Sequence, residues 1–193
     1  MIALQLDKLF YTSEKTVLSN MELNIAKGEI VTILGKSGCG KSTLLRAIAG
    51  LHPNYEGTIQ TESNKIGYIP QNKCLLPWKT VYENLILLKK VEAPVSKEKA
   101  TALLQRLQIE ELKDQYVNRL SGGEYQRVTL GQVFYYEPDI ILMDEPFSAL
   151  DAQTKDEILR LFLELQQENR ITTVFVTHSL EEAKFVKGRI IRL

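Results

Sequence analysis

The segment 35–42 constrains the fold of this chain more than any other feature of its sequence. It reads Gly-Lys-Ser-Gly-Cys-Gly-Lys-Ser and matches the pattern G-x-x-x-x-G-K-[ST]. A β-branched apolar run at 29–34 leads into it, and residues 42–49 follow with apolar side chains at helical spacing. A strand, a glycine loop and a helix in this order predict a loop whose backbone N–H groups surround a phosphate group.

The residue types of this loop fit a nucleoside triphosphate. Lys41 has the length to reach the β and γ oxygens, and the Ser42 hydroxyl is a suitable ligand for Mg²⁺. A glycine-rich turn without a ligand is the alternative, and the flanking strand and helix argue against it. The residues expected at the nucleotide are Gly35, Lys36, Ser37, Gly38, Cys39, Gly40, Lys41, Ser42 and Thr43.

Composition narrows the class of protein further. The 193 residues are enough for one core, and 24 basic against 24 acidic side chains favour neither nucleic acid nor anionic lipid as a partner. Cys39 lies inside the glycine loop, so we expect it and Cys74 to be reduced thiols, as in the cytosol. The N-terminus lacks a leader pattern and no stretch approaches about 18 apolar residues, so we expect a membrane role only through a partner.

Strand patterns lie on both sides of a long helical region. Residues 2–6 and 21–25 alternate between apolar and polar or small side chains, which is typical of half-buried strands. Two short strands are expected at 58–60 and 65–69, around a polar turn at 62–64. The chain therefore opens as a β-region.

The C-terminal part has the pattern of a parallel sheet. Apolar runs at 140–143 and 173–176 are bounded by polar residues, as in central strands that are covered on both faces. Between them, 151–168 is predicted to be an amphipathic helix. These elements predict an α/β fold with a mainly parallel sheet and an N-terminal antiparallel β-region.

Between residues 81 and 136 the apolar spacing becomes helical. We interpret 72–136 as a helical subdomain inserted into a core made of 1–71 and 137–193. The side chains expected to face inward in this subdomain are Leu85, Leu88, Leu103, Leu104, Leu107, Val128 and Phe134.

Two acids end the apolar run at 140–143. Asp144 would lie beside the Mg²⁺, and Glu145 beside the water that attacks the γ-phosphate. An acidic pair after a strand is by itself a common loop cap. It indicates catalysis only because the phosphate loop is present in the same chain.

Residues 120–127 read Leu-Ser-Gly-Gly-Glu-Tyr-Gln-Arg, which resembles the signature motif of the ATP-binding cassette family. The resemblance extends from Tyr11 to about Gly188. It implies a P-loop NTPase core with an inserted helical subdomain, and it implies ATP and Mg²⁺ as ligands.

The family resemblance also implies that two cassettes pair head to tail. Ser121 and the N–H groups of Gly122 and Gly123, with Glu124 next to them, would then contact the γ-phosphate held by the partner's loop. A serine and two glycines at the start of a helix are suited to bind an anion. A plain helix N-cap would explain Ser121 but not the glycines.

Three further residues resemble family elements in the expected order. Gln71 resembles the glutamine loop, which helps to bind magnesium and water and senses the transmembrane partner. Asp151 resembles the D-loop that crosses the dimer interface, and it is equally consistent with the N-cap of the helix at 151–168. His178 resembles the switch histidine that contacts the γ-phosphate. A lone histidine is often structural, but this one follows a core strand, where sites form in such sheets.

Two aromatic residues have open roles. Tyr11 resembles the aromatic side chain that stacks on adenine, although a tyrosine in a β-region is often a packed residue. The run Leu-Leu-Pro-Trp that ends at Trp78 is similar to a segment of importers of the nitrate, sulfonate and taurine group. Trp78 is expected either to meet a permease helix or to lie in a core.

The chain departs from the family pattern at three places. Glu124 stands where glutamine is commonest, and 131–133 reads Gly-Gln-Val where an Ala-Arg-Ala type of run is usual. The second departure leaves the packing or partner contact of that helix open. The sequence ends at Leu193 without the usual terminal helices, so we expect no regulatory C-terminal domain.

The resemblance implies the ATP-hydrolysing subunit of a transporter, at the cytoplasmic face of the cell membrane, and favours import over export. The expected partners are a second identical or related cassette, an integral membrane permease and a substrate-binding protein, but not nucleic acid. One alternative is a soluble cassette ATPase acting on DNA or ribosomes, although the chain has neither a long inserted coiled coil nor a second cassette. A small-molecule kinase would leave the signature and His178 unexplained.

Overall fold

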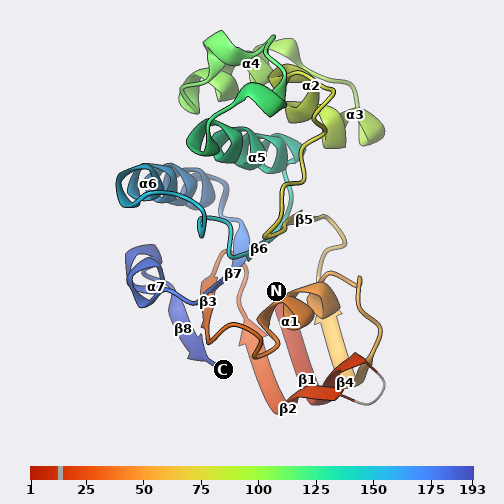
Figure 1. Ribbon diagram of the computed structural model, residues 1–193. Coiled ribbons are helices and arrows are strands. Elements are labelled where there is room, and N and C mark those ends of the chain that lie inside the picture. Colours follow the sequence, from red (N-terminus) through yellow and green to blue (C-terminus); the bar gives the residue numbers. More distant parts are fainter. Residues whose placement is uncertain (13–14) are drawn as a thin grey trace. The chain divides into compact units, whose positions relative to one another are not determined.

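The computed structural model describes residues 1–12 and 15–193 of the chain. They form two compact units, coloured along the sequence in Figure 1. The first unit comprises 1–68, 139–145 and 166–193, and the second comprises 69–138 and 146–165. The first unit contains the sheets and the second contains mainly helices, which confirms the predicted α/β class.

An antiparallel sheet opens the first unit, as predicted. Its strand order is β2 (Lys15–Ile25), β1 (Ile2–Thr12) and β4 (Tyr55–Thr61). In β1, Ile2 and Leu4 are buried while Gln5 between Leu4 and Leu6 is exposed. The alternation of apolar and polar residues therefore means that one face of β1 is turned to the core.

The second sheet of this unit has the order β5 (Ile66–Ile69), β6 (Ile140–Asp144), β7 (Thr172–Thr177), β3 (Ile30–Leu34) and β8 (Arg189–Arg192). Strand β7 pairs in parallel with both β3 and β6, and every residue of β6 and β7 is buried. The short strands predicted at 58–60 and 65–69 both form. They join different sheets, since β4 pairs with β1 and β5 lies next to β6.

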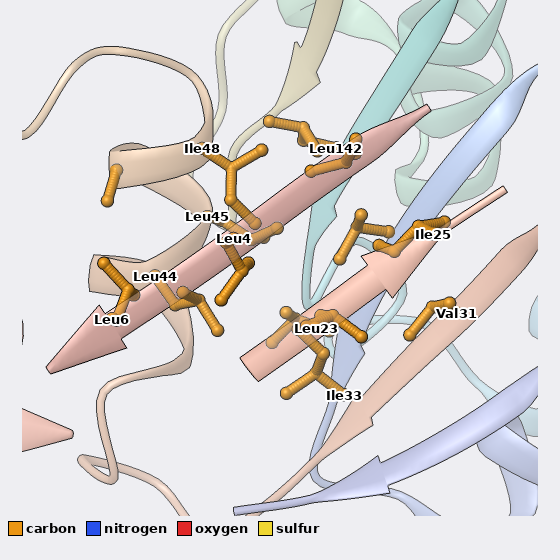
Figure 2. Close-up of a cluster of buried hydrophobic side chains, with 14 of the residues drawn as sticks. Leu4, Leu6, Leu23, Ile25, Val31, Ile33, Leu44, Leu45, Ile48 and Leu142 are labelled. Atoms are coloured by element: carbon orange, nitrogen blue, oxygen red, sulfur yellow. The ribbon is translucent and has the colours of Figure 1, made fainter. Parts of the chain in front are cut away.

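The core of the first unit lies between the two sheets and helix α1 (Lys41–Ile48), as Figure 2 shows. Leu44 and Leu45 of α1 are fully buried, each contributing about 1.5–3 kcal/mol relative to exposure. They meet Leu4 and Leu6 of β1 and Val31 of β3 in one cluster. The packing fixes α1, and with it the loop that precedes α1. Helix α7 (Leu180–Val186) contacts β3 and β7.

The second unit is built from short helices around α5 (Gly122–Tyr136). The others are α2 (Val81–Leu85), α3 (Leu87–Glu92) and α4 (Lys97–Arg106), with 3-10 turns η1 (Glu110–Leu112) and η2 (Val117–Arg119). Most of the predicted inward side chains are buried. Leu88 was wrongly predicted to face inward, since it is 37% exposed. The helix is interrupted at Ile86, between α2 and α3, and the helical spacing changes phase there. Leu103 is half-buried.

The unusual run at 131–133 has a packing explanation within this unit. A Cβ atom on Gly131 would lie 2.6 Å from Leu107 Cδ1 and 2.7 Å from Leu85 Cδ1, so a larger residue would force these leucines to shift away from α5. Gln132 is buried and its Nε2 donates to the carbonyl of Asn84 at 2.7 Å. The departure from the family pattern is therefore accommodated inside the helical unit.

Helix α6 (Ala152–Asn169) forms where the amphipathic pattern predicted it. Its apolar face is buried through Ile158, Leu159 and Phe162. The Phe162 ring lies 6.2 Å from the ring of Phe134 in α5, measured between centroids. This aromatic contact belongs to the second unit.

Candidate functional site

The glycine loop joins the end of β3 to the start of α1, as predicted. Gly38 and Gly40 have φ angles of 82° and 101°, a region that side chains with a Cβ atom rarely adopt. A Cβ atom on Gly40 would lie 3.1 Å from Val17 Cβ of the antiparallel sheet. Conformation therefore favours glycine at both positions, and close packing restricts Gly40 as well. Thr43, also predicted at the nucleotide, is buried in α1.

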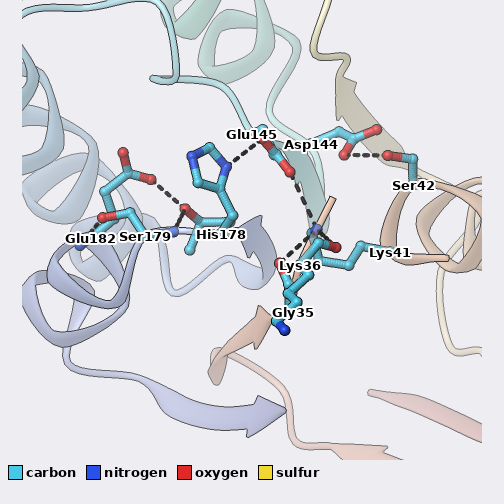
Figure 3. Close-up of polar contacts among 10 residues, drawn as sticks. Gly35, Lys36, Lys41, Ser42, Asp144, Glu145, His178, Ser179 and Glu182 are labelled. Atoms are coloured by element: carbon cyan, nitrogen blue, oxygen red, sulfur yellow. Dashed lines mark hydrogen bonds and ion pairs between the residues drawn. The ribbon is translucent and has the colours of Figure 1, made fainter. Parts of the chain in front are cut away.

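Lys41 lies folded back over the loop that precedes it. Its side chain is only 4% exposed, and Nζ donates to the carbonyl oxygens of Gly35 and Lys36, each at 2.9 Å. Nζ also lies 3.3 Å from Glu145 Oε1 (Figure 3). A single buried ammonium group thus connects the loop to the end of β6, where its positive charge is little screened by water.

Asp144 ends β6 and faces the first turn of α1. The Ser42 hydroxyl donates to Asp144 Oδ1 at 2.9 Å, and the Tyr68 hydroxyl donates to Oδ2 at 3.3 Å. Asp144 is 2% exposed, and burial raises the pKa of its carboxyl group. Burial and the nearby Asp144 also raise the pKa of Tyr68 to about 12, so the phenol stays a donor. Sequence reasoning did not identify Tyr68, whose only signal is its place in the strand beside β6.

Glu145 adopts a left-handed backbone conformation, with φ at 46°. Such strain in a residue with a side chain persists only where the surroundings impose it, and it is common at functional sites. The Glu145 N–H donates to the carbonyl of Val176 at 3.0 Å. The turn directs the carboxylate, whose side chain is 11% exposed, between Lys41 and His178 (Figure 3).

His178 follows β7, the central neighbour of both β3 and β6. Its Nδ1 lies 2.7 Å from Glu145 Oε2, and its side chain is 52% exposed. It also lines an open hollow of about 590 Å³, together with Gly35, Lys36, Ser37 and Leu180. The first unit therefore brings five predicted residues together at the carboxyl ends of three parallel strands: Lys41, Ser42, Asp144, Glu145 and His178.

The signature residues begin helix α5 in the second unit. Ser121 is the N-cap and its Oγ accepts from the N–H of Glu124 at 3.3 Å, while Glu124 Oε2 accepts from the N–H of Ser121 at 2.7 Å. This reciprocal capping box takes either glutamate or glutamine at its third helical position. The departure at Glu124 therefore preserves the local structure.

The two signature glycines have unequal surroundings. A Cβ atom on Gly123 would lie 2.7 Å from Thr154 Cγ2, and one on Gly122 would lie 3.4 Å from Leu150 Cδ2. Gly123 is thus needed for the close approach of α6, whereas Gly122 is exposed and only loosely restricted. The sequence predicted that both glycines help to bind an anion. Packing within the second unit accounts for Gly123 but not for Gly122.

Three other predicted residues are placed by local contacts. Asp151 does cap α6, since its Oδ1 accepts from the N–H of Thr154 at 3.0 Å, and this bond is the main reason that the pKa of Asp151 is lowered. Gln71 is exposed in the second unit. Tyr11 is 59% exposed at the end of β1, so it is not a packed core residue.

The Leu-Leu-Pro-Trp segment is a rigid loop that presents its tryptophan to solvent. Asn84 is fully buried, its Oδ1 accepts from the N–H of Leu76 at 2.8 Å, and its Nδ2 donates to the carbonyl of Thr80 at 3.0 Å. Trp78 is 68% exposed, so the interpretation as a core residue is wrong. Tyr116, which is paired with Thr80 in an isolated bridge, is 47% exposed.

Two expectations from composition can be compared with the structure. Cys39 and Cys74 are free thiols, as predicted. Within the ranges 1–12 and 15–193, no helix has the length and apolar character needed to cross a membrane.

The fold and the site define a P-loop ATPase, because the phosphate loop and the acids Asp144 and Glu145 converge at the ends of parallel strands. A family model described as "ABC transporter" matches residues 18–148. The chain belongs to this family. It is an ATP-binding and ATP-hydrolysing cassette.

Curated relatives are named as importer subunits. The chain is 37% identical over 184 residues to the aliphatic sulfonates import ATP-binding protein SsuB of Bacillus subtilis (strain 168), covering 92% of this chain and 72% of SsuB. It is 41% identical over 192 residues to the sulfate/thiosulfate import ATP-binding protein CysA of Escherichia coli (strain K12), covering 91% of this chain and 53% of CysA. These relatives agree with the resemblance to the nitrate, sulfonate and taurine group.

Solved structures of transporter cassettes share the fold. The dimeric structure of MJ0796, a bacterial ABC transporter cassette, is 35% identical with a TM-score of 0.84, covering all of this chain and 94% of that chain. A dimeric structure of the same cassette in a post-hydrolysis state, bound to ADP and Pi, is 34% identical with a TM-score of 0.84 and the same coverage.

Proposed function

We propose that this chain is the ATPase subunit of an ABC importer, in which two cassettes close around two ATP molecules and act on a separate permease. The observation that carries the proposal is the cluster of Lys41, Ser42, Asp144, Glu145 and His178 in the first unit. With an ATP γ-phosphate bound to the loop, these side chains would supply positive charge, metal ligands and a base.

The oxygen atoms of Ser42 and Asp144 fit a magnesium ion. They lie 2.9 Å apart, and Mg²⁺ prefers oxygen ligands together with phosphate oxygens and water. The residues 1–12 and 15–193 contain no cluster of three His, Cys, Asp or Glu side chains that would hold a metal without the nucleotide. When bound, Mg²⁺ would neutralise charge that develops on the phosphates, and Gln71 would complete its ligands.

Glu145 is the proposed base for water. Its two oxygens contact Lys41 and His178, so the carboxylate is held at a defined place. A γ-phosphate on the loop would offer Lys41 a more highly charged partner, and Oε1 of Glu145 would then be available to a water molecule. His178 would hold the γ-phosphate, and Tyr11 would stack on the adenine ring.

The signature would complete the site of a second cassette. Ser121 and Gly122 are exposed at the start of α5, and the first N–H groups of a helix favour an anion. We propose that Ser121, Gly122, Gly123 and Glu124 approach the γ-phosphate on the partner's loop, with Asp151 at the interface. The dimeric MJ0796 structures support the pairing of two cassettes.

Transport requires a membrane partner, and the names of SsuB and CysA as import ATP-binding proteins support one. The rigid loop that presents Trp78 and the neighbouring Tyr116 supports contact with a permease, because exposed aromatic side chains are enriched at interfaces. The cassette would lie at the cytoplasmic face, with a substrate-binding protein serving the permease. The names of SsuB and CysA support an oxyanion or sulfonate as solute, and neither name points to a nucleic-acid or ribosome partner.

The substitution Glu145→Gln tests the proposed function. We expect ATP binding to persist, kcat to fall by about 100-fold or more because the base is lost, and an ATP-bound dimer to accumulate. Steady-state ATPase assays and light scattering with ATP measure the two effects. Glu22→Gln, an exposed glutamate of β2, is the matched control and should behave as wild type. Unchanged hydrolysis in Glu145→Gln would remove Glu145 from this role.

A further inference from the structure

Three glutamates of the described chain occupy the same position, the third residue of a helix whose N-cap is serine or threonine: Glu83, Glu124 and Glu182. In α2 and α5 the glutamate accepts directly from the N–H of its own N-cap, Thr80 at 2.9 Å and Ser121 at 2.7 Å. Both are ordinary capping boxes.

Helix α7 differs because a hydroxyl group is inserted into the box. The N–H of its N-cap, Ser179, donates to Thr177 Oγ1 at 2.9 Å, and Thr177 Oγ1 donates to Glu182 Oε2 at 2.6 Å. Ser179 and Glu182 are labelled in Figure 3 beside His178. The carboxylate therefore reaches past its own cap to the residue before His178.

The box of α7 also differs from the box of α2 in its burial. Glu182 is 5% exposed and Thr177 is 1% exposed, whereas the Glu83 side chain is 48% exposed. Burying a carboxylate is unfavourable unless hydrogen bonds satisfy it, so an exposed box would cap α7 at a smaller cost. Capping alone does not explain why the glutamate of α7 is buried.

The inserted hydroxyl fixes the backbone on both sides of His178. Thr177 is held by its hydroxyl, and its carbonyl accepts from the N–H of Gly35 in the phosphate loop at 3.3 Å. Ser179 is held by its N–H. The His178 ring itself is half exposed, so packing around the ring contributes little to its position.

We propose that Glu182, acting through the Thr177 hydroxyl, is a positioning residue for His178. It holds the segment 177–179 so that the His178 ring meets Glu145 and the γ-phosphate at the loop. The inference rests on the role proposed above for His178. A displacement of about 1 Å in a catalytic group is enough to lower a rate by about 100-fold. Loss of a hydrogen bond next to His178 can therefore change kcat measurably.

Thr177→Val removes the hydroxyl and keeps the shape of the side chain. We expect kcat for ATP to fall by about 10- to 100-fold, with KM within about threefold of wild type, because the loop that binds ATP is unchanged. Thr177→Ser restores the hydroxyl and should recover kcat to within about threefold. Glu83→Gln, in the exposed box of α2, is the matched control and should leave ATPase activity unchanged.

A double-mutant cycle with His178→Ala separates positioning from a general structural effect. If Glu182 and Thr177 act through His178, Thr177→Val should change kcat by less than about twofold in the His178→Ala background, measured in single turnover. The same loss of kcat in both backgrounds would overturn the inference while leaving the role of His178 intact. Wild-type activity in His178→Ala alone would overturn the role of His178 and the inference with it.

Glu182→Asp serves if Thr177→Val does not fold. It keeps the charge near the start of α7 but shortens the side chain, so that the carboxylate withdraws from Thr177 Oγ1. The same cycle applies: we expect a fall in kcat that disappears in the His178→Ala background. Wild-type kcat in Glu182→Asp, with the Thr177 hydrogen bond shown by NMR to be lost, would contradict the proposal.

Discussion

The phosphate-loop site of the first unit and the signature of the second unit satisfy their polar groups in different ways. Lys41 and Asp144 are buried, Glu145 is largely so, and all three contact residues far away in the sequence. The side chains of Ser121 and Glu124 each accept from the other's backbone N–H group in the capping box, and Ser121 is exposed. The first arrangement is a site assembled by folding, whereas the second is a helix start that leaves room for a ligand from outside the chain.

A second contrast between the units concerns two pairs of lysine and glutamate. In the first unit, Lys41 and Glu145 are 4% and 11% exposed and lie 3.3 Å apart. In the second unit, Lys89 and Glu137 are 19% and 51% exposed and lie 2.7 Å apart. The first pair lies in the proposed catalytic cluster and includes the strained Glu145 backbone, so a role in the site accounts for it better than stability does. The exposed pair is an ordinary surface contact.

The largest expected effect separates the two capping boxes of the second unit. Ser121→Ala and Thr80→Ala each remove a cap hydroxyl and should each lower the free energy of unfolding by about 1 kcal/mol. Only Ser121→Ala should also lower ATPase activity, by about 10- to 100-fold, because Ser121 contacts the γ-phosphate in the proposed dimer. Chemical denaturation and steady-state ATPase assays measure the two effects. Equal activity in both variants would show that Ser121 acts only as a helix N-cap and not at the γ-phosphate.

The contrast also shows what sequence reasoning reaches. Lys41, Ser42 and Asp144 were predicted because each belongs to a contiguous pattern with a required spacing. The hydrogen bond from Tyr68 to Asp144 depends on which strand lies beside β6, and no local pattern encodes that order.

Local context also decided the errors in the sequence predictions. Leu88 is exposed because the helix breaks at Ile86, although the apolar spacing continues through that point. Trp78 faces solvent because Asn84 holds its loop, and a hydrogen bond from a buried asparagine leaves no trace in hydropathy. The left-handed backbone conformation of Glu145 was not predicted either, since nothing in the sequence of the two acids specifies the φ angle.

A smaller effect is expected at Gly131, which tests whether its role is packing within the second unit. Gly131→Ala gains about 1 kcal/mol in helix propensity, but its Cβ atom would overlap Leu85 and Leu107, which are fully buried and have little space to move. Overpacking of this kind costs about 1–3 kcal/mol, so the net effect should be destabilising by up to about 2 kcal/mol.

Thermal unfolding of Gly131→Ala measures this effect, and Gln105→Ala on the exposed side of α4 is the control. We expect the melting temperature to fall by up to about 8 °C in Gly131→Ala and to remain unchanged in the control. A higher melting temperature in Gly131→Ala would show that helix propensity outweighs the leucine contacts.

The smallest expected effect concerns Glu137 and its pH dependence. The hydrogen bond from Lys89 lowers the pKa of Glu137 below its usual value of 4.5, so the pair stabilises the fold above that pH and stops doing so as pH falls through the lowered pKa. Glu137→Gln should therefore lower the free energy of unfolding by less than about 1 kcal/mol at pH 7, since Glu137 is half exposed. Urea unfolding at pH 7 and pH 3 measures the difference. A loss that is as large at pH 3 would point to the backbone of Glu137 instead.

In the proposed dimer each site needs the loop of one chain and the signature of another, and complementation tests this most directly. Lys41→Ala destroys the loop and keeps the signature, and Gly122→Asp keeps the loop and places a negative charge in the signature. Neither protein alone should hydrolyse ATP, but their mixture should, because a mixed dimer contains one site with intact Lys41 and intact Gly122. An inactive mixture, in which light scattering shows that mixed dimers form, or full activity of Gly122→Asp alone, would contradict a site shared between two chains.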